Sequence, residues 1–141
     1  MLRYVLVSLL TGVVFGVLDG VINANRLAQR LYEVYKPIAR ESVDAPLGVA
    51  VDLLYGFVMA ALFLILYESL PGSRGFWKGV SFGLIAWFFR VVMSVMGSWV
   101  TFRVPGEALF YSLLTGLAEM LILGMLYGLL LRPAPGSTSR A

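Results

Sequence analysis

The sequence predicts an all-α polytopic integral membrane protein, an antiparallel four-transmembrane-helix bundle with an amphipathic segment in the first loop. Of its 141 residues, 60% are hydrophobic and 13% are charged, against about 25% charged in soluble domains. Four apolar stretches each approach the roughly 20 residues that a helix needs to cross about 30 Å of hydrocarbon. They cover residues 2–22, 47–67, 75–100 and 108–131. We therefore expect residues 1–131 to form one transmembrane domain, with any chemistry inside the bundle or at its rims.

The first stretch follows Met1-Leu2-Arg3, a short basic end of the kind that opens a secretory signal peptide. Two features favour a permanent membrane helix instead. The apolar run is long enough to span the membrane, and the cleavage-like sequence Ile22-Asn23-Ala24 has a large residue where a small one is required. We therefore predict that this helix is retained.

Residues 26–40 have a different pattern from the four apolar stretches. Two sets of side chains fall on separate faces at helical spacing. The apolar set is Leu27, Leu31, Val34, Tyr35 and Ile38, and the charged set is Arg26, Arg30, Glu33 and Arg40. This pattern is typical of an interfacial helix at the membrane surface. A solvated extension of the first helix, broken before Pro37, is the alternative.

Turn residues and aromatic belts delimit the third and fourth stretches. Trp77 and Trp99 lie about 33 Å apart along a helix, which places them at opposite headgroup regions. Segments 71–75 and 103–107 contain Pro and Gly and predict tight turns, so consecutive helices are antiparallel neighbours. Residues 132–141 carry two prolines and nothing to bury, which predicts a flexible tail.

The composition also bears on cofactors, partners and location. The chain has no Cys and no His, which removes thiol chemistry and the usual zinc and haem ligands. We expect no cofactor, no metal and no nucleic-acid partner, because the net charge of +3 is modest and the basic residues lie at segment ends. Those residues would meet membrane lipids. Lys and Arg are balanced between the two sides, and we expect a prokaryotic plasma (inner) membrane with both termini cytoplasmic.

Small residues recur at every fourth position in the predicted helices. Such rows let helix backbones approach closely in lipid, where association depends on packing and polar contacts. The main members are Gly12, Gly16, Gly20, Gly79, Gly83, Gly124 and Gly128. The rows do not decide between packing inside one bundle and packing against a second subunit. Segments 12–17 and 79–84 also resemble one another, through either duplication of a helical hairpin or chance.

Four ionisable side chains fall inside the predicted spans, each costing on the order of 2.5–3.5 kcal/mol at a helix centre. They are Asp19, Asp52, Arg90 and Glu119, and each shares a helix face with small or polar residues such as Asn23. Asp19 and Asp52 lie roughly 6–8 Å inside the side that carries the first loop, so their carboxylates could meet at one level. Arg90 and Glu119 lie about 16–20 Å from that side and are expected to pair.

Three interpretations of this cluster remain. In the first, the Arg90–Glu119 pair fixes helix register and the two Asp residues form hydrogen bonds near the headgroups. In the second, the stripe is a hydrated vestibule in which the Asp residues take a cation or proton and the pair acts as a gate. The third, lipid chemistry at the Asp residues, lacks a metal-ligand cluster or nucleophile motif, so we do not expect an enzyme.

The sequence thus supports two hypotheses of function. The first is a protein that acts through lateral helix packing, as a homo-oligomer or as an accessory subunit of a larger membrane complex, because glycine rows and little extramembrane mass favour lateral contacts. The alternative is a small transporter or channel for a cation or proton that uses the Asp, Arg and Glu side chains within the spans.

Overall fold

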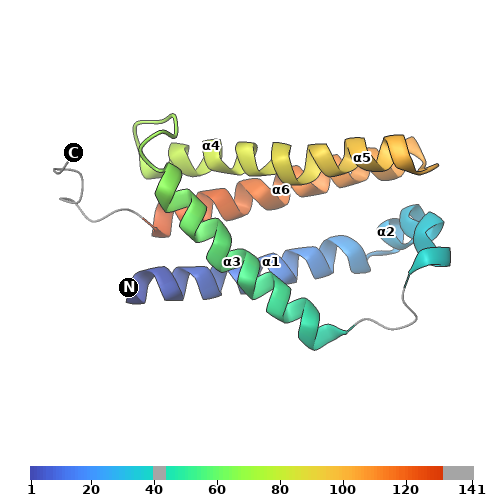
Figure 1. Cartoon of the computed structure of the whole chain (residues 1–141), viewed down its shortest axis with the longest axis horizontal. Helices are drawn as coiled ribbons and strands as arrows, with labels where there is room; N and C mark the ends of the chain where they lie inside the picture. Colours follow the sequence, from blue (N-terminus) through green and yellow to red (C-terminus); the bar gives the residue numbers. More distant parts are fainter. Residues whose placement is uncertain (40–43, 132–141) are drawn as a thin grey trace.

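The computed structural model describes residues 1–39 and 44–131, and this part of the chain is helical with no strand. Four helices in it are long and apolar enough to cross a membrane. They run antiparallel, so that the N-terminus and the end of the fourth span lie at the same end of the molecule (Figure 1). The predicted fold class, an all-α four-helix membrane bundle, is confirmed.

Two short helices lie between the first and second spans, at the end of the molecule opposite the N-terminus (Figure 1). The third span is continuous but has three parts, because a π-helical turn, η2, interrupts it. In chain order the elements are α1 (Leu2–Ala24), α2 (Arg26–Leu31), η1 (Tyr32–Ile38), α3 (Ala45–Leu66), α4 (Gly75–Trp87), η2 (Phe88–Val92), α5 (Met93–Thr101) and α6 (Gly106–Leu130). We call the end that carries α2 and η1 the loop end, and the other the terminal end.

Local chemistry sets the helix boundaries. The second span begins two residues earlier than predicted, because the Asp44 side chain accepts a hydrogen bond from the Leu47 amide and Pro46 occupies the first turn. The fourth span also begins two residues early, directly after Pro105. The predicted tail, residues 132–141, lies outside the described residues.

Asn25 separates α1 from the segment that follows it. Its backbone is extended, its side-chain amide donates to the carbonyl of Ile22, and its Oδ1 accepts from the Ala28 amide. One side chain therefore caps the end of α1 and the start of α2. The chain breaks here, not before Pro37, which lies inside the 3₁₀ helix η1. Segment 26–38 is thus two short helices, and Arg40 lies outside the described residues.

The spans pack as two tight pairs, α1 with α3 and α4 with α6. In the first pair, a Cβ on Gly56 would collide with the Ser8 carbonyl oxygen, and one on Gly12 would lie 2.9 Å from the Leu53 Cα. In the second, the four glycines at the contact each face backbone atoms of the partner helix; they are Gly79, Gly83, Gly124 and Gly128. Hydrogen in place of a side chain lets the backbones touch.

The remaining two glycines of the predicted rows behave differently. A Cβ on Gly16 would lie 2.7 Å from the Asp52 Oδ2, a side-chain atom. A Cβ on Gly20 would meet nothing within 4 Å in the described chain. The structure therefore gives Gly20 no packing partner, because α3 has already diverged from α1 at that level.

An aromatic cluster joins the two pairs near the terminal end. The rings of Phe63, Phe82 and Tyr127 lie 5.3–6.0 Å apart between centroids. Phe63 and Tyr127 are fully buried, and the Tyr127 hydroxyl donates to the Gly56 carbonyl at 3.0 Å. This cluster fills the space between the pairs and closes the bundle at this end.

The change Tyr127→Phe is expected to lower the free energy of unfolding by about 1 kcal/mol, the usual contribution of one buried hydrogen bond. Tyr35→Phe is the matched control, because no hydrogen bond from the Tyr35 hydroxyl is present among the described residues. Reversible unfolding in mixed detergent micelles measures both. A loss as large in Tyr35→Phe as in Tyr127→Phe would contradict the assignment.

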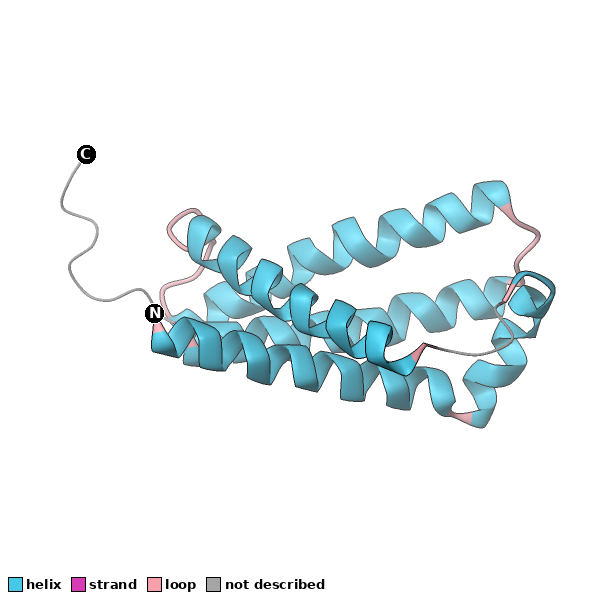
Figure 2. Ribbon diagram, turned by 60° about the horizontal axis from the view of Figure 1, so that its bottom comes forward, coloured by secondary structure: helices cyan, strands magenta, loops and turns pink. Residues whose placement is uncertain are grey.

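The bundle is open at the loop end, because two helices leave their neighbours there. α3 crosses the other spans obliquely (Figure 1), and its first seven residues, 45–51, are all exposed. α5 has no buried residue and makes few contacts with α6, whereas α4 packs closely along it. Figure 2 shows the third span rising away from the others after its midpoint. The two halves of the molecule therefore differ in packing.

Candidate functional site

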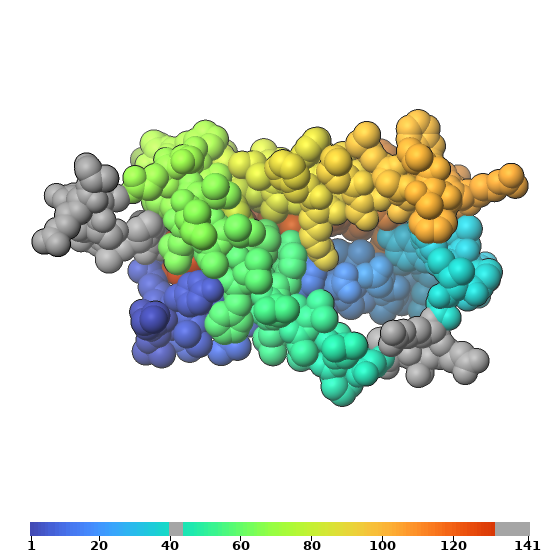
Figure 3. Space-filling model, in the orientation of Figure 1, coloured from blue at the N-terminus to red at the C-terminus, as the bar shows by residue number. Residues whose placement is uncertain are grey.

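A polar cavity of about 410 Å³ lies in the open half of the bundle. Figure 3 shows the hollow between α5 and α1. It reaches from the short helix η1 at the loop end to the middle of α6, and no residue of α3 lines it. The lining residues are Asp19, Ile22, Asn23, Tyr32, Tyr35, Arg90, Val91, Ser94, Val95, Ser98, Leu109, Ser112, Thr115, Gly116 and Glu119. Four of the five polar residues singled out from the sequence, all except Asp52, thus border one space.

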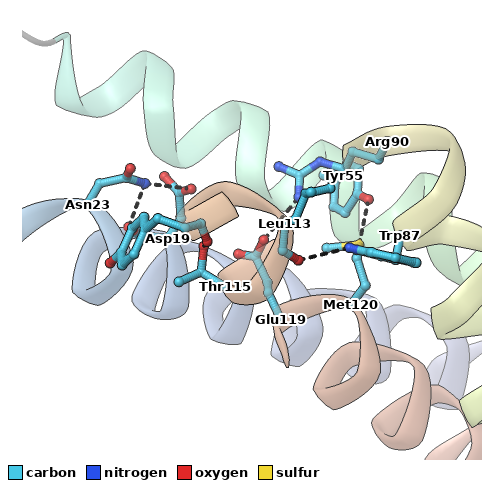
Figure 4. Close-up of polar contacts among 10 residues, drawn as sticks. Asp19, Asn23, Tyr55, Trp87, Arg90, Leu113, Thr115, Glu119 and Met120 are labelled. Atoms are coloured by element: carbon cyan, nitrogen blue, oxygen red, sulfur yellow. Dashed lines mark hydrogen bonds and ion pairs between the residues drawn. The ribbon is translucent and has the colours of Figure 1, made fainter. Parts of the chain in front are cut away.

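Arg90 and Glu119 form the deep end of this cavity. The Arg90 Nη1 donates to the Glu119 Oε2 at 3.0 Å, and Figure 4 shows the two side chains pointing toward one another. Glu119 is 4% exposed, whereas the Arg90 side chain is 36% exposed. The second oxygen, Glu119 Oε1, is buried and has no hydrogen-bond partner among the described residues. A buried carboxylate oxygen without a hydrogen-bond partner costs free energy, so its presence in the site requires an explanation.

Two aromatic rings from the other helix pair hold the Arg90 guanidinium. Its Cζ lies 4.5 Å from the centroid of the Phe15 ring and 4.8 Å from that of Tyr55. These rings stack on each other at 4.5 Å, and the Tyr55 hydroxyl lies 3.5 Å from the Met120 Sδ. Cation–π contact stabilises a partly desolvated arginine. Arg90 therefore connects α4–α6 to α1–α3.

The backbone at Arg90 is itself unusual. η2, residues Phe88–Val92, is a single π-helical turn in the middle of the third span. Such turns insert an extra residue into a helix and are frequent at functional sites. This turn marks the point beyond which α5 leaves α6, and it carries the one basic side chain of the cavity lining.

The two aspartates lie in different places. Asp19 is exposed to the cavity, and its Oδ1 accepts a hydrogen bond from the Asn23 Nδ2 at 3.0 Å (Figure 4). Asp52 lies against Gly16 and borders a separate, largely apolar groove with Val17. No hydrogen bond joins the two carboxylates among the described residues. The sequence places these carboxylates at one level, where they could meet; in the structure they border different spaces, because α3 does not line the cavity.

Hydrogen bonds fasten the short helix η1 over the mouth of the cavity. The Tyr32 hydroxyl lies 2.9 Å from the Ser112 Oγ. Nearby, the Asn25 Nδ2 donates to the Tyr111 hydroxyl at 2.7 Å, and that hydroxyl donates to the Ile22 carbonyl. Burial raises the pKa of the Tyr32 phenol above its ordinary value, so this group stays neutral near pH 7.

Sequence reasoning missed the partners of the charged residues. The rings beside Arg90 come from Phe15 and Tyr55, whereas the adjacent aromatic Trp87 donates its Nε1–H to the Leu113 carbonyl. Tyr32 was assigned no role, although it lies at the mouth. A helical wheel could have placed Phe15 near the face of Asp19. Nothing in the sequence indicates that α3 contributes no residue to the cavity lining.

Fold and site together define the class of the chain: a polytopic membrane protein with a polar cavity between its spans. Among the described residues, no group of three or more Asp, Glu, His or Cys side chains is placed to hold a metal ion. No protein-family model, no curated protein and no solved structure matches the chain. Any function must therefore be argued from the site itself.

Proposed function

We propose that the protein is a small transporter or channel that takes up a cation or proton through the cavity at its loop end. The observation that carries this proposal is Glu119 Oε1, a buried carboxylate oxygen without a hydrogen-bond partner among the described residues, on a side chain that lines the cavity. Ionisable groups inside membrane spans typically mark ion or proton pathways. In the expected plasma-membrane orientation, with both termini cytoplasmic, the cavity opens to the outside.

The charges and lone pairs of the cavity favour a positive guest. Among the described residues of the lining, Asp19 and Glu119 supply two carboxylates against one guanidinium, that of Arg90. The Ser112 and Thr115 hydroxyls donate their protons to carbonyls of their own helix, so each leaves oxygen lone pairs for other partners. Oxygen lone pairs and carboxylates attract protons and hard cations.

Arg90 and the aromatic cluster would control passage beyond Glu119. An entering cation competes with the guanidinium for the carboxylate, while the rings of Phe15 and Tyr55 retain the displaced arginine. Past this point the core around Phe63 and Tyr127 closes the terminal end. Release to that side requires the two helix pairs to separate, which is the behaviour of a gated carrier and not of an open pore.

Uptake into reconstituted vesicles tests the proposal, with pyranine fluorescence for protons and radiolabelled methylammonium for a small cation. We expect the wild type to exceed empty vesicles for at least one probe. Glu119→Gln and Asp19→Asn are expected to reduce that uptake roughly tenfold, because each removes a charge that attracts the guest. Asp19 is exposed, so its variant folds and keeps the test informative if Glu119→Gln does not.

Glu107→Gln is the matched control for both variants. Glu107 is an exposed acid in the first turn of the same helix as Glu119, and it does not line the cavity. Its uptake is expected to stay within twofold of wild type. Neither probe entering faster than in empty vesicles, or equal losses in all three variants, would refute the transport proposal.

Lateral assembly is a second candidate function. The glycine contacts described above lie within the chain and so remove part of the reason for it. Gly20 and Gly48, however, would each accept a side chain without meeting an atom within 4 Å, so small residues remain open on α1 and α3. Mass measurement in mild detergent tests for a homo-oligomer or a co-purifying subunit, and a strict monomer without a partner argues against both.

A further inference from the structure

The splay between α5 and α6 creates a second groove, on the side of these helices away from the polar cavity. It has a volume of about 300 Å³ and an almost entirely apolar lining. Met96, Trp99, Phe110 and Leu113 form its walls, and Met96, Trp99 and Phe110 are 52–69% exposed on the surface of the spans. In a membrane, this groove extends from the headgroup level of Trp99 toward the acyl chains.

The groove and the polar cavity share part of their lining. Val95 and Leu109 line both spaces, so these two side chains form part of the wall between them, where α5 faces α6. The helices are loosely packed there, since a Cβ on Gly97 or Gly106 would meet nothing within 4 Å. The terminal half of the same helix pair is instead held by direct backbone contact between glycines, as at Gly79 and Gly124. The two spaces therefore adjoin between α5 and α6 at the wall that includes Val95 and Leu109, and we call this place the slot.

We propose that the cation is amphiphilic and enters sideways from the bilayer through the slot between α5 and α6. Its ammonium head occupies the cavity near Glu119 and Asp19, while its alkyl chain passes between Val95 and Leu109 and lies in the apolar groove. This inference rests on the proposed function and names the substrate class of the same site. It accounts for a polar cavity and an apolar groove that share a wall.

The polarity of the two spaces matches the two ends of such a molecule. The cavity offers carboxylates and hydroxyl oxygens, which suit a positively charged head. The groove offers only hydrocarbon and the rings of Trp99 and Phe110, which suit an alkyl chain. A small hydrophilic cation would use the cavity alone and would gain nothing from the groove.

Competition between probes of graded chain length tests the inference. Tetramethylammonium, butyltrimethylammonium and octyltrimethylammonium inhibit the vesicle uptake of methylammonium, with inhibitor concentrations referred to the aqueous phase. Each methylene removed from water contributes about fourfold in affinity. We expect the octyl compound to inhibit at least tenfold more tightly than tetramethylammonium, and the butyl compound to fall between them.

Two tryptophan substitutions in α5 separate binding in the groove from general accumulation in the bilayer. Met96→Trp fills the groove and is expected to bring the octyl compound to within threefold of tetramethylammonium. Val100→Trp is the matched control, since Val100 is 83% exposed and lies outside the groove, so it should keep the wild-type ratio.

The outcomes distinguish this inference from the function on which it rests. Methylammonium uptake with no dependence on chain length overturns lateral entry and leaves transport standing; ordinary lipid then fills the groove. A dependence that persists unchanged in Met96→Trp also overturns lateral entry. Absence of uptake in the wild type overturns transport and lateral entry together.

Discussion

Replacing Gly124 with leucine is expected to unfold the α4–α6 pair and to cost at least about 3 kcal/mol of stability, the upper end of the range for overpacked cores. A Cβ at this position would already overlap the carbonyl oxygen of Gly79 and lie 2.8 Å from the Gly83 nitrogen. Both are backbone atoms of α4, so no side chain can rotate away to make room. The measurement is reversible unfolding in mixed micelles, with gel filtration to follow aggregation.

Gly97→Leu provides the matched control, because it makes the same change within the third span at a position with nothing within 4 Å. Its free energy of unfolding should stay within about 0.5 kcal/mol of wild type, as for exposed substitutions elsewhere. Equal stability of the two variants would mean that α4 and α6 do not touch as the structure has them.

Glu119→Gln is expected to lower the free energy of unfolding by roughly 2–3 kcal/mol, whereas Asp19→Asn should change it by less than about 0.5 kcal/mol. The first change removes the carboxylate that lies 3.0 Å from Arg90 and leaves the guanidinium without its ion-pair partner. This loss is smaller than the roughly 3–5 kcal/mol that follows removal of one partner from a fully buried ion pair. The difference arises because the Arg90 side chain is 36% exposed and keeps its aromatic contacts.

The smaller effect at Asp19 follows from its surroundings. Asp19 is exposed, and within residues 1–39 and 44–131 its carboxylate is bonded to Asn23 alone, a contact that water can replace. Unfolding of both variants and of Glu107→Gln under one set of conditions provides the comparison. Equal losses at positions 19 and 119 would contradict a stabilising role for the Arg90–Glu119 contact.

The number and placement of the spans followed from hydropathy, because the cost of exposing backbone and charge to hydrocarbon leaves little freedom. The same cost singled out Arg90 and Glu119, which the structure brings within hydrogen-bond distance. Boundaries moved by two residues where a single cap decides them, as at Asp44. Spans and helix boundaries of this kind depend on residues that are close together in the sequence.

Helix tilt could not be predicted, and the shape of the site depends on it. The oblique course of α3 is set by the close contact of Gly12 and Gly56. The sequence contains several similar rows of small residues, and their spacing does not show which row makes this contact. As a consequence Asp52 borders a separate groove. The π turn at Phe88–Val92 was also not predicted from the apolar pattern.

The uneven closure of the bundle also has an electrical consequence. In the orientation proposed above, electrolyte in the cavity would bring the outer bulk potential down to Arg90 and Glu119, near mid-depth. The membrane voltage would then drop mainly across the half that Phe63, Phe82 and Tyr127 seal, roughly half of the 30 Å hydrocarbon thickness. A single positive charge moving inward from Glu119 would thereby gain about 2.3 kcal/mol per 100 mV. Because the sealed half is short, the electric field is strongest where a bound cation leaves the Glu119 carboxylate.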